Sequence, residues 1–379
     1  MTLNRRKFLQ VGSVAAAFAV FTPSALAQSG DIKIGAFAAM SGAAAAQGKS
    51  VVEGVDLAVK ARNAAGGING RKIQLVIGDD AGKPEEAAVV ARRFATRDGV
   101  TLAIGSVSSP ASLAAAQVFR EEEVPQIVVS GTAQRITTQG NQWVFRSTVP
   151  DRKFVADLVD FLNEKHPKLK RFGFIYVNDD FGKGGFDSFV EAGKKYGITV
   201  VAEERYTRGD VDFVGQLTKI RAANPDAIVD WSRYTEGALL QRQMRQMGLS
   251  SLPRFGGDGW GQKAFLDLAG DAANDCVYAT HFSPATSSAI PEAQRFMEAF
   301  QKAYGKLPDY VNAQAYDAAM IAFAAIERAK SSDRTAVRNA LRQTDYASVR
   351  GPFKFDSKGD PTLTTHMVRI VNGKEVNAR

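Results

Sequence analysis

The sequence is poor in the residues that carry catalysis, metal binding and covalent cross-linking. Cys276 is its only cysteine, so a disulfide bond within the chain is impossible. The histidines His166, His281 and His366 lie far apart in the sequence and show no metal-ligand spacing. A G-x-S-x-G nucleophile motif is also missing. We therefore expect no catalytic residue, no metal site and no cofactor.

Long apolar runs are missing as well, apart from a short one near the N-terminus. The chain starts with a charged segment that contains Arg5 and Arg6, continues through an apolar run at 11–21 and reaches a small-residue site that ends at Ala27. This run is much shorter than the roughly 20 residues that span a bilayer. We expect a twin-arginine-like signal peptide over residues 1–27, with the general secretory route as the alternative. Since no cysteine follows the cleavage site after Ala27, we expect a free periplasmic protein rather than a lipoprotein.

The charge balance gives little sign of a nucleic-acid partner. The chain has 48 Lys and Arg against 40 Asp and Glu, a net charge of +8, and residues 1–27 carry Arg5, Arg6 and Lys7 but no acid. The densest basic cluster, at 165–171, contains no interleaved aromatic platform on which bases could stack. It is typical of a solvated helix end that runs into a strand. We expect no nucleic-acid binding.

Short β-type runs alternate with amphipathic helical stretches along the chain. A strand at 32–37, a helix at 50–65 and a strand at 72–77 open the pattern, which restarts after residue 150. Such alternation indicates parallel sheets covered by helices. With 379 residues, of which 45% are hydrophobic, the chain is long enough for two domains. We predict an α/β fold with two doubly wound lobes, and a β-hairpin formed by 352–355 and 367–371.

Two loops rich in hydroxyl side chains follow neighbouring strands. The first hydroxyl loop (residues 106–109) comes after a strand at 101–104 and precedes a helix, with Ser108 or Ser109 as its N-cap. The second hydroxyl loop (residues 130–132) follows a strand at 126–129. Hydroxyl groups and free helix N–H groups at the carboxyl ends of parallel strands bind small anions. Simple N-capping is the alternative for the first loop, but two such loops in succession favour a carboxylate-binding site.

A third loop offers a partner for a cation. Residues 254–260 place Asp258 between glycines, where its carboxylate could neutralise an ammonium group, although a local turn hydrogen bond is the alternative. Several aromatic side chains stand in loops or at helix starts, where each could be either packing or a pocket wall: Phe181, Tyr234, Trp260 and Tyr310. Together with the hydroxyl loops, these residues match the pattern of a small-molecule cleft.

At this point the chain resembles a known family over nearly its full length after the signal peptide. The matching segments, in family order, are IKIGAFAAMSG, GGINGRKIQLVIGDDAGKPEEA, LAIGSVSS, FIYVNDDFGKG, GGDGW and GPFKFDSKGD. They are similar to the periplasmic solute-binding proteins of the branched-chain amino acid (leucine/isoleucine/valine) ABC transporter family. The resemblance implies two Rossmann-like lobes joined by hinge strands, the periplasmic binding protein type I fold, with a ligand cleft between them. Lobe one would be 30–149 with 282–350, and lobe two 150–281 with 351–379.

The resemblance also implies roles for particular residues. The ligand's α-carboxylate would be held by Ser109, with its neighbour Ser108, and by the second hydroxyl loop, Ser130, Gly131 and Thr132. Asp258 would hold the ammonium group, and the pocket aromatics would be Phe181, Tyr234 and Tyr310. Gln47 stands where an aromatic residue is common in the family, which implies a more polar pocket.

The sequence therefore predicts a non-enzymatic, monomeric component of an ABC importer. It would capture an L-amino acid, of aliphatic or branched-chain type, by lobe closure and deliver it to a membrane permease. One alternative is the same fold binding an aromatic or other small carboxylate without an amine. The other is an exported hydrolase, which the missing nucleophile motif disfavours.

Overall fold

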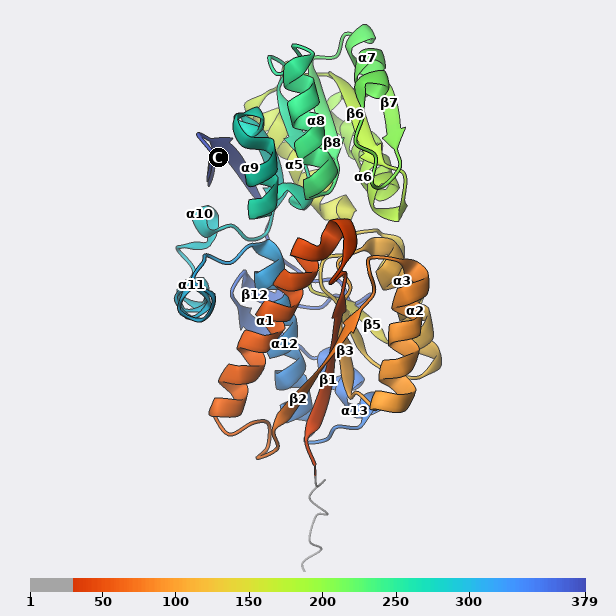
Figure 1. The fold of residues 1–379 in the computed structure, drawn as a ribbon, viewed down its shortest axis with the longest axis vertical. Coiled ribbons are helices and arrows are strands. Elements are labelled where there is room, and N and C mark those ends of the chain that lie inside the picture. Colours follow the sequence, from red (N-terminus) through yellow and green to blue (C-terminus); the bar gives the residue numbers. More distant parts are fainter. Residues whose placement is uncertain (1–29) are drawn as a thin grey trace, which may run out of the picture.

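The computed structural model describes residues 30–379, and the expected signal peptide lies outside them. The chain forms two α/β lobes stacked along the long axis of the molecule, lobe one at the bottom of Figure 1 and lobe two at the top. This confirms the prediction of two α/β lobes with parallel sheets. Among the described residues, no helix combines the length and the apolar character that a membrane crossing requires.

Lobe one is built on a five-stranded sheet in the order β2-β1-β3-β4-β5. All its neighbouring strands are parallel: β1 (Ile32–Ala38), β2 (Ile73–Asp79), β3 (Leu102–Ile104), β4 (Gln126–Val128) and β5 (Val144–Arg146). The short central strands are wholly buried, and all their residues except Gln126 are apolar, as expected for a parallel sheet covered on both faces. Two helix pairs pack on the sheet, α1 (Ala45–Ala64) with α12 (Tyr310–Ala329) and α2 (Pro84–Arg93) with α3 (Ser109–Glu121). Smaller elements complete this lobe: α4 (Arg135–Thr138), α11 (Pro291–Tyr304), α13 (Arg334–Leu341), β11 (Asp345–Ser348) and β12 (Gly351–Lys354).

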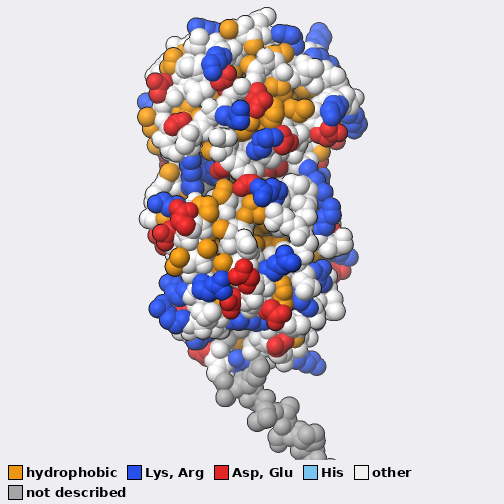
Figure 2. Space-filling view, turned by 90° about the vertical axis from the view of Figure 1, so that its right-hand side faces the viewer, with side chains coloured by type: hydrophobic (Ala, Val, Ile, Leu, Met, Phe, Trp, Pro, Cys, Tyr) orange, Lys and Arg blue, Asp and Glu red, His pale blue; other side chains and the backbone are white. Residues whose placement is uncertain are grey.

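Lobe two is built on a seven-stranded sheet in the order β14-β13-β10-β9-β8-β6-β7. Its parallel strands are β6 (Arg171–Val177), β7 (Thr199–Tyr206), β8 (Ala227–Trp231), β9 (Arg254–Gly256) and β10 (Cys276–Thr280). At one edge β13 (His366–Val371) and β14 (Lys374–Asn377) run antiparallel to their neighbours. The covering helices are α5 (Asp151–Lys165), α6 (Asp180–Gly193), α7 (Val214–Ala222), α8 (Tyr234–Gln246) and α9 (Lys263–Ala269). On the face drawn in Figure 2, basic and acidic side chains are interspersed over both lobes.

The predicted hairpin at the C-terminal end is wrong. Strand β12 pairs with β11, whereas β13 pairs with β10 in the large sheet. The segment between β12 and β13 crosses from one lobe to the other, which separates the two strands that the sequence pattern suggested as partners. The expected boundary of lobe one at residue 350 also lies too early in the chain. Phe355 packs on Phe145, with 5.0 Å between ring centroids, so the chain just after β12 lies on lobe one.

The chain crosses between the lobes three times, after β5, after β10 and before β13. The second crossing includes α10 (Pro284–Ser287). A buried polar cluster ties the first two crossings together: His281 Nε2 lies 3.1 Å from Thr148 Oγ1. Arg350, also fully buried, donates to Ser147 O at 2.7 Å and pairs with Asp317 Oδ2 at 2.6 Å. The crossings are therefore held by specific side chains rather than by loose linkers.

Candidate ligand-binding cleft

The carboxyl ends of the parallel strands of both lobes face each other where the lobes meet. Strands β3 and β4 lead into the two hydroxyl loops of lobe one, and β8 and β9 lead into the facing loops of lobe two. A small cavity lies between them. Its lining residues come from both lobes: Gln47, Val107, Ser109, Ser130, Phe181, Arg233, Asp258, Gly259 and Tyr310. A cavity lined by polar groups from two facing lobes is a candidate site for a small molecule.

The hydroxyl loops of lobe one are bonded to each other. Ser109 Oγ accepts from Ala133 N at 3.2 Å, and Ser130 N donates to Ser106 O at 3.2 Å. Ser108 is the N-cap of α3, which begins at Ser109, yet its own hydroxyl makes no capping bond. The Ser108 hydroxyl is buried and has no hydrogen-bond partner within residues 30–379. The two loops thus form one surface of small polar groups at the start of a helix, where an anion is favoured.

Asp258 faces these loops from lobe two. It begins a short 3₁₀-helix (Asp258–Trp260) directly after β9, and its side chain is buried. Its Oδ2 atom has no hydrogen-bond partner in the described part of the chain. Burial, and then the negative charge of Asp151, raise the pKa of Asp258 well above its usual value, while Arg233 acts in the opposite direction. A cationic ligand group beside Oδ2 would oppose both effects and favour the ionised carboxylate.

Arg233 is a cavity residue that the sequence analysis missed. It is the N-cap of α8 and only 8% exposed. Its Nη1 lies 3.0 Å from Asp179 Oδ2, and its guanidinium lies 5.0 Å from the centroid of the Phe181 ring. Val107 and Gly259 were also missed. All three follow the carboxyl end of a buried strand, and that position was the signal that could have pointed to them.

Three further cavity residues were predicted and complete the walls. Tyr310, at the start of α12, accepts a 2.8 Å hydrogen bond on its hydroxyl from Gln47 Nε2. Phe181 stands in the first turn of α6, whose N-cap Asp179 accepts from the backbone N–H of Phe181 at 2.9 Å. The cavity therefore has a neutral polar side in lobe one and a charged, aromatic side in lobe two.

The remaining predicted residues do not line the cavity. Trp260 stacks on Phe265 with 5.2 Å between ring centroids and is fully buried in the core of lobe two. Its ring fills space beside Gly237 and Gly256, where an added Cβ would come within 2.7 Å and 2.8 Å of it. The expected role of Trp260 as a pocket wall is therefore replaced by core packing.

Ser108, Gly131 and Thr132 lie just behind the lining residues of lobe one. Tyr234 joins the two lobes, because its hydroxyl donates to Ala43 O of lobe one at 2.7 Å. Other contacts also join the lobes: Arg208 Nη1 donates to Gly82 O at 2.8 Å, and Arg135 pairs with Asp180 at 2.7 Å. These bonds describe a closed arrangement in which both lobes surround the cavity.

Two α/β lobes that close on a small polar cavity define a bilobed solute-binding protein. A family model described as periplasmic binding protein matches residues 31–375, and the chain belongs to that family of solute-binding proteins. Its fold is thus the periplasmic binding protein type I fold, as the resemblance implied.

Relatives of known name agree with this assignment. The chain is 32% identical to the Leu/Ile/Val-binding protein homolog 3 of Brucella melitensis, over 91% of this chain and 92% of the relative. The crystal structure of the leucine binding protein LivK from Thermotoga maritima is similar, with a TM-score of 0.87 and 30% identity over 92% of this chain and 98% of that one. The structure of LivJ from Streptococcus pneumoniae in complex with isoleucine has a TM-score of 0.84 and 31% identity over 91% and 97%. The resemblance to branched-chain amino acid binding proteins is confirmed.

Proposed function

We propose that this protein captures an L-amino acid of aliphatic or branched-chain type between its lobes and delivers it to the permease of an ABC importer. The observation that carries the proposal is the arrangement of Asp258 and the hydroxyl loops around one cavity. Asp258 offers a carboxylate oxygen without a protein partner among residues 30–379, and Ser109 and Ser130 face it from the other lobe. An α-amino acid carries the two complementary groups next to each other. The names of the relatives support the same ligand class.

A ligand of this kind would favour lobe closure. Its carboxylate would contact lobe one and its ammonium group lobe two, so both contacts exist only when the lobes are together. A ligand shifts a conformational equilibrium by its difference in affinity for the two states. Tyr234, Arg208 and Arg135 would then add bonds between the lobes that the permease can read as the closed form.

One observation favours a second ligand class, a small carboxylate without an amine. Arg233 places a buried guanidinium in the cavity, and guanidinium groups pair well with carboxylates. If Arg233 binds such a ligand, Arg233→Met should weaken benzoate binding by about 1.5–3 kcal/mol, because a hydrogen bond to a charged group is lost. L-leucine binding should change far less. Calorimetry on both ligands with the variant and the wild type separates the two classes.

We further propose that the mature protein begins after Ala27 and acts in the periplasm as a monomer, without catalysis, metal or cofactor. Sequencing the N-terminus of the protein recovered from a periplasmic fraction tests the cleavage site. Sedimentation velocity tests the monomer. Incubation with a panel of esters and amides, with analysis for released product, tests for a hydrolase.

The experiment that tests the main proposal is calorimetry on mature protein, unfolded and refolded to strip any bound ligand. The panel is a set of L-amino acids together with aromatic carboxylates of matched size. We expect tight binding to be confined to amino acids and to become much weaker when the amine is removed. Equal binding of ligands with and without an amine would contradict the role of Asp258 while leaving the carboxylate site intact.

A further inference from the structure

A fully buried arginine lies behind the second hydroxyl loop, outside the set of cavity residues. Arg146 ends β5, and its side chain is 0% exposed. Its Nε donates to Asp360 Oδ1 at 2.8 Å, and its Nη2 lies 2.7 Å from the same oxygen. Thr137 joins the pair by accepting from Arg146 Nη2 at 2.5 Å and donating to Asp360 at 2.7 Å. Asp360 neutralises the guanidinium, so Arg146 is not itself a free charge for an anion.

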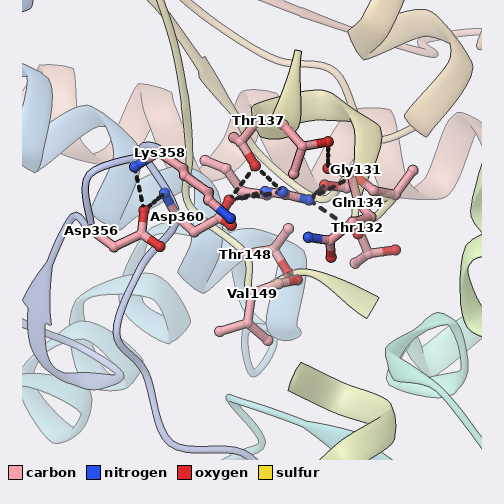
Figure 3. A network of polar contacts seen from close by, with 12 residues as sticks. Gly131, Thr132, Gln134, Thr137, Thr148, Val149, Asp356, Lys358 and Asp360 are labelled. Carbon is pink, nitrogen blue, oxygen red and sulfur yellow. Dashed lines mark hydrogen bonds and ion pairs between the residues drawn. The ribbon is translucent and has the colours of Figure 1, made fainter. Parts of the chain in front are cut away.

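The remaining donor group of Arg146 holds the backbone of the loop. Nη1 donates to three successive carbonyl oxygens, those of Gly131 at 3.4 Å, Thr132 at 3.0 Å and Ala133 at 3.0 Å. In Figure 3, Asp360 and Thr137 lie at one end of this network, and Gly131 and Thr132 at the other. In a trans peptide unit the C=O and N–H bonds point in opposite directions. Carbonyls that point to Arg146 therefore turn the following N–H groups away from it.

The direction of these N–H groups is visible at Ala133. Its amide donates to Ser109 Oγ, a cavity residue, at 3.2 Å. The amide of Thr132, which follows the carbonyl of Gly131, has no acceptor among residues 30–379, and Thr132 is only 1% exposed. Buried N–H groups without an acceptor are rare in native structures. Those of this loop are donors available to a ligand.

We propose that Arg146 and Asp360 are positioning residues for the ligand's carboxylate. They draw the carbonyl oxygens of residues 131–133 to the rear of the loop, so that its amides and hydroxyls converge on the anion at the front. The nearby cation also polarises these peptide groups, which strengthens them as donors. Asp360 belongs to the segment that crosses back to lobe two, so this crossing is tied to the carboxylate site. The inference rests on the proposed function, because it takes the ligand to be a carboxylate.

The first test separates positioning from general loosening of the protein. Arg146→Lys keeps the positive charge but cannot hold three carbonyls and Asp360 together. We expect at least about a tenfold loss of affinity for both L-leucine and benzoate, because misplaced donors bind the anion poorly. Leucinol, which keeps the amine and side chain of leucine but lacks the carboxylate, should bind as it does to the wild type. The matched control is Arg152→Gln, because Arg152 is 46% exposed and contacts Asp360 only at 3.4 Å. An equal loss for all three ligands would overturn the proposal.

The second test needs no ligand. Crystal structures of Arg146→Lys and of the milder Asp360→Asn should show the carbonyls of residues 131–133 turned from their wild-type direction and the bond from Ala133 N to Ser109 Oγ broken. If Arg146→Lys does not fold, Asp360→Asn alone decides the question. An unchanged loop in the variant would overturn the proposal. A wild-type protein that binds no L-amino acid would contradict the proposed function instead, and the loop conformations would still decide this inference.

Discussion

The two lobes contribute to the cavity in different ways. Lobe one supplies only neutral groups, among them the hydroxyls of Ser109, Ser130 and Tyr310. Lobe two supplies the charged side chains, Asp258 and Arg233. The hydroxyl loops of lobe one are fixed by backbone bonds and by the buried pair of Arg146 with Asp360. Under the proposed function, lobe one would bind the ligand's carboxylate through neutral donors, and lobe two would bind its ammonium group through a charged side chain.

The largest effect should come from removing the charge of lobe two. Asp258→Asn keeps the size of the side chain but cannot neutralise an ammonium group. We expect amino-acid binding to weaken by about 2–4 kcal/mol, because a buried charge pair is lost. Calorimetry with L-leucine measures the change, and leucine's deaminated analogue 4-methylpentanoate is the control ligand, whose affinity should not fall. Near-normal leucine binding in Asp258→Asn would contradict the assignment of the ammonium contact to lobe two.

The pH dependence of binding sharpens the same contrast. Burial in the closed arrangement raises the pKa of Asp258, so without a cationic ligand group the carboxyl of the closed form holds its proton to a higher pH than usual. Binding an ammonium group requires the ionised form, so a proton is released on binding and affinity rises with pH. Below the raised pKa we expect a loss of about tenfold in affinity per pH unit, the change expected for one proton. Asp258→Asn should abolish this dependence. If the affinity of that variant still rose with pH, the titration of another group would be responsible.

A smaller effect is expected from lobe one. Ser109→Ala removes a cavity hydroxyl and should weaken carboxylate binding by about 1–2 kcal/mol, because one hydrogen bond to a charged group is lost. The matched control is Ser108→Ala in the same loop, since Ser108 is buried but does not line the cavity. Titration of both variants with L-leucine compares them. Equal losses would show that the loop as a whole, rather than the Ser109 hydroxyl, binds the anion.

The smallest effect should come from a bond between the lobes that touches no ligand. Tyr234→Phe removes the bond to Ala43 O, which can exist only when the lobes are together. We expect about 0.5–1.5 kcal/mol weaker binding through a smaller closed population. Tyr304→Phe is the matched control, because its hydroxyl bonds to Glu53 O within lobe one at 3.0 Å. Small-angle scattering without ligand should show a more open average for Tyr234→Phe only.

The sequence was informative wherever local signals were sufficient. Helix α11 has clear local signals at both ends, because Pro291 starts it and Gly305, at φ +69°, ends it. The hairpin prediction failed because β12 pairs with the preceding strand β11, whereas β13 pairs with the following strand β14 and with β10, which is distant in the sequence.

The candidate site shows the same difference between local signals and contacts that form only on folding. Ser109 and Asp258 were found because they follow strand ends, which is a local signal. Trp260 could not be placed from its type alone, because the space for its ring in the core is left by Gly256 and by Gly237 of α8. Arg233 also follows a strand end, but its contacts with Asp179 and Phe181, some fifty residues distant, form only in the folded chain.

The three crossings between the lobes have a consequence for engineering. Because the C-terminal strands return to lobe two after β11 and β12 have packed on lobe one, neither lobe is one continuous stretch of chain. A chimera that takes lobe two from a relative would need three splice points, next to the buried contacts of His281, Arg350 and Asp360. Recombination of whole segments is therefore an unfavourable way to change what this scaffold binds. Point substitutions at the lobe-two face of the cavity leave all three splice regions intact and are the more practical way to change its ligand.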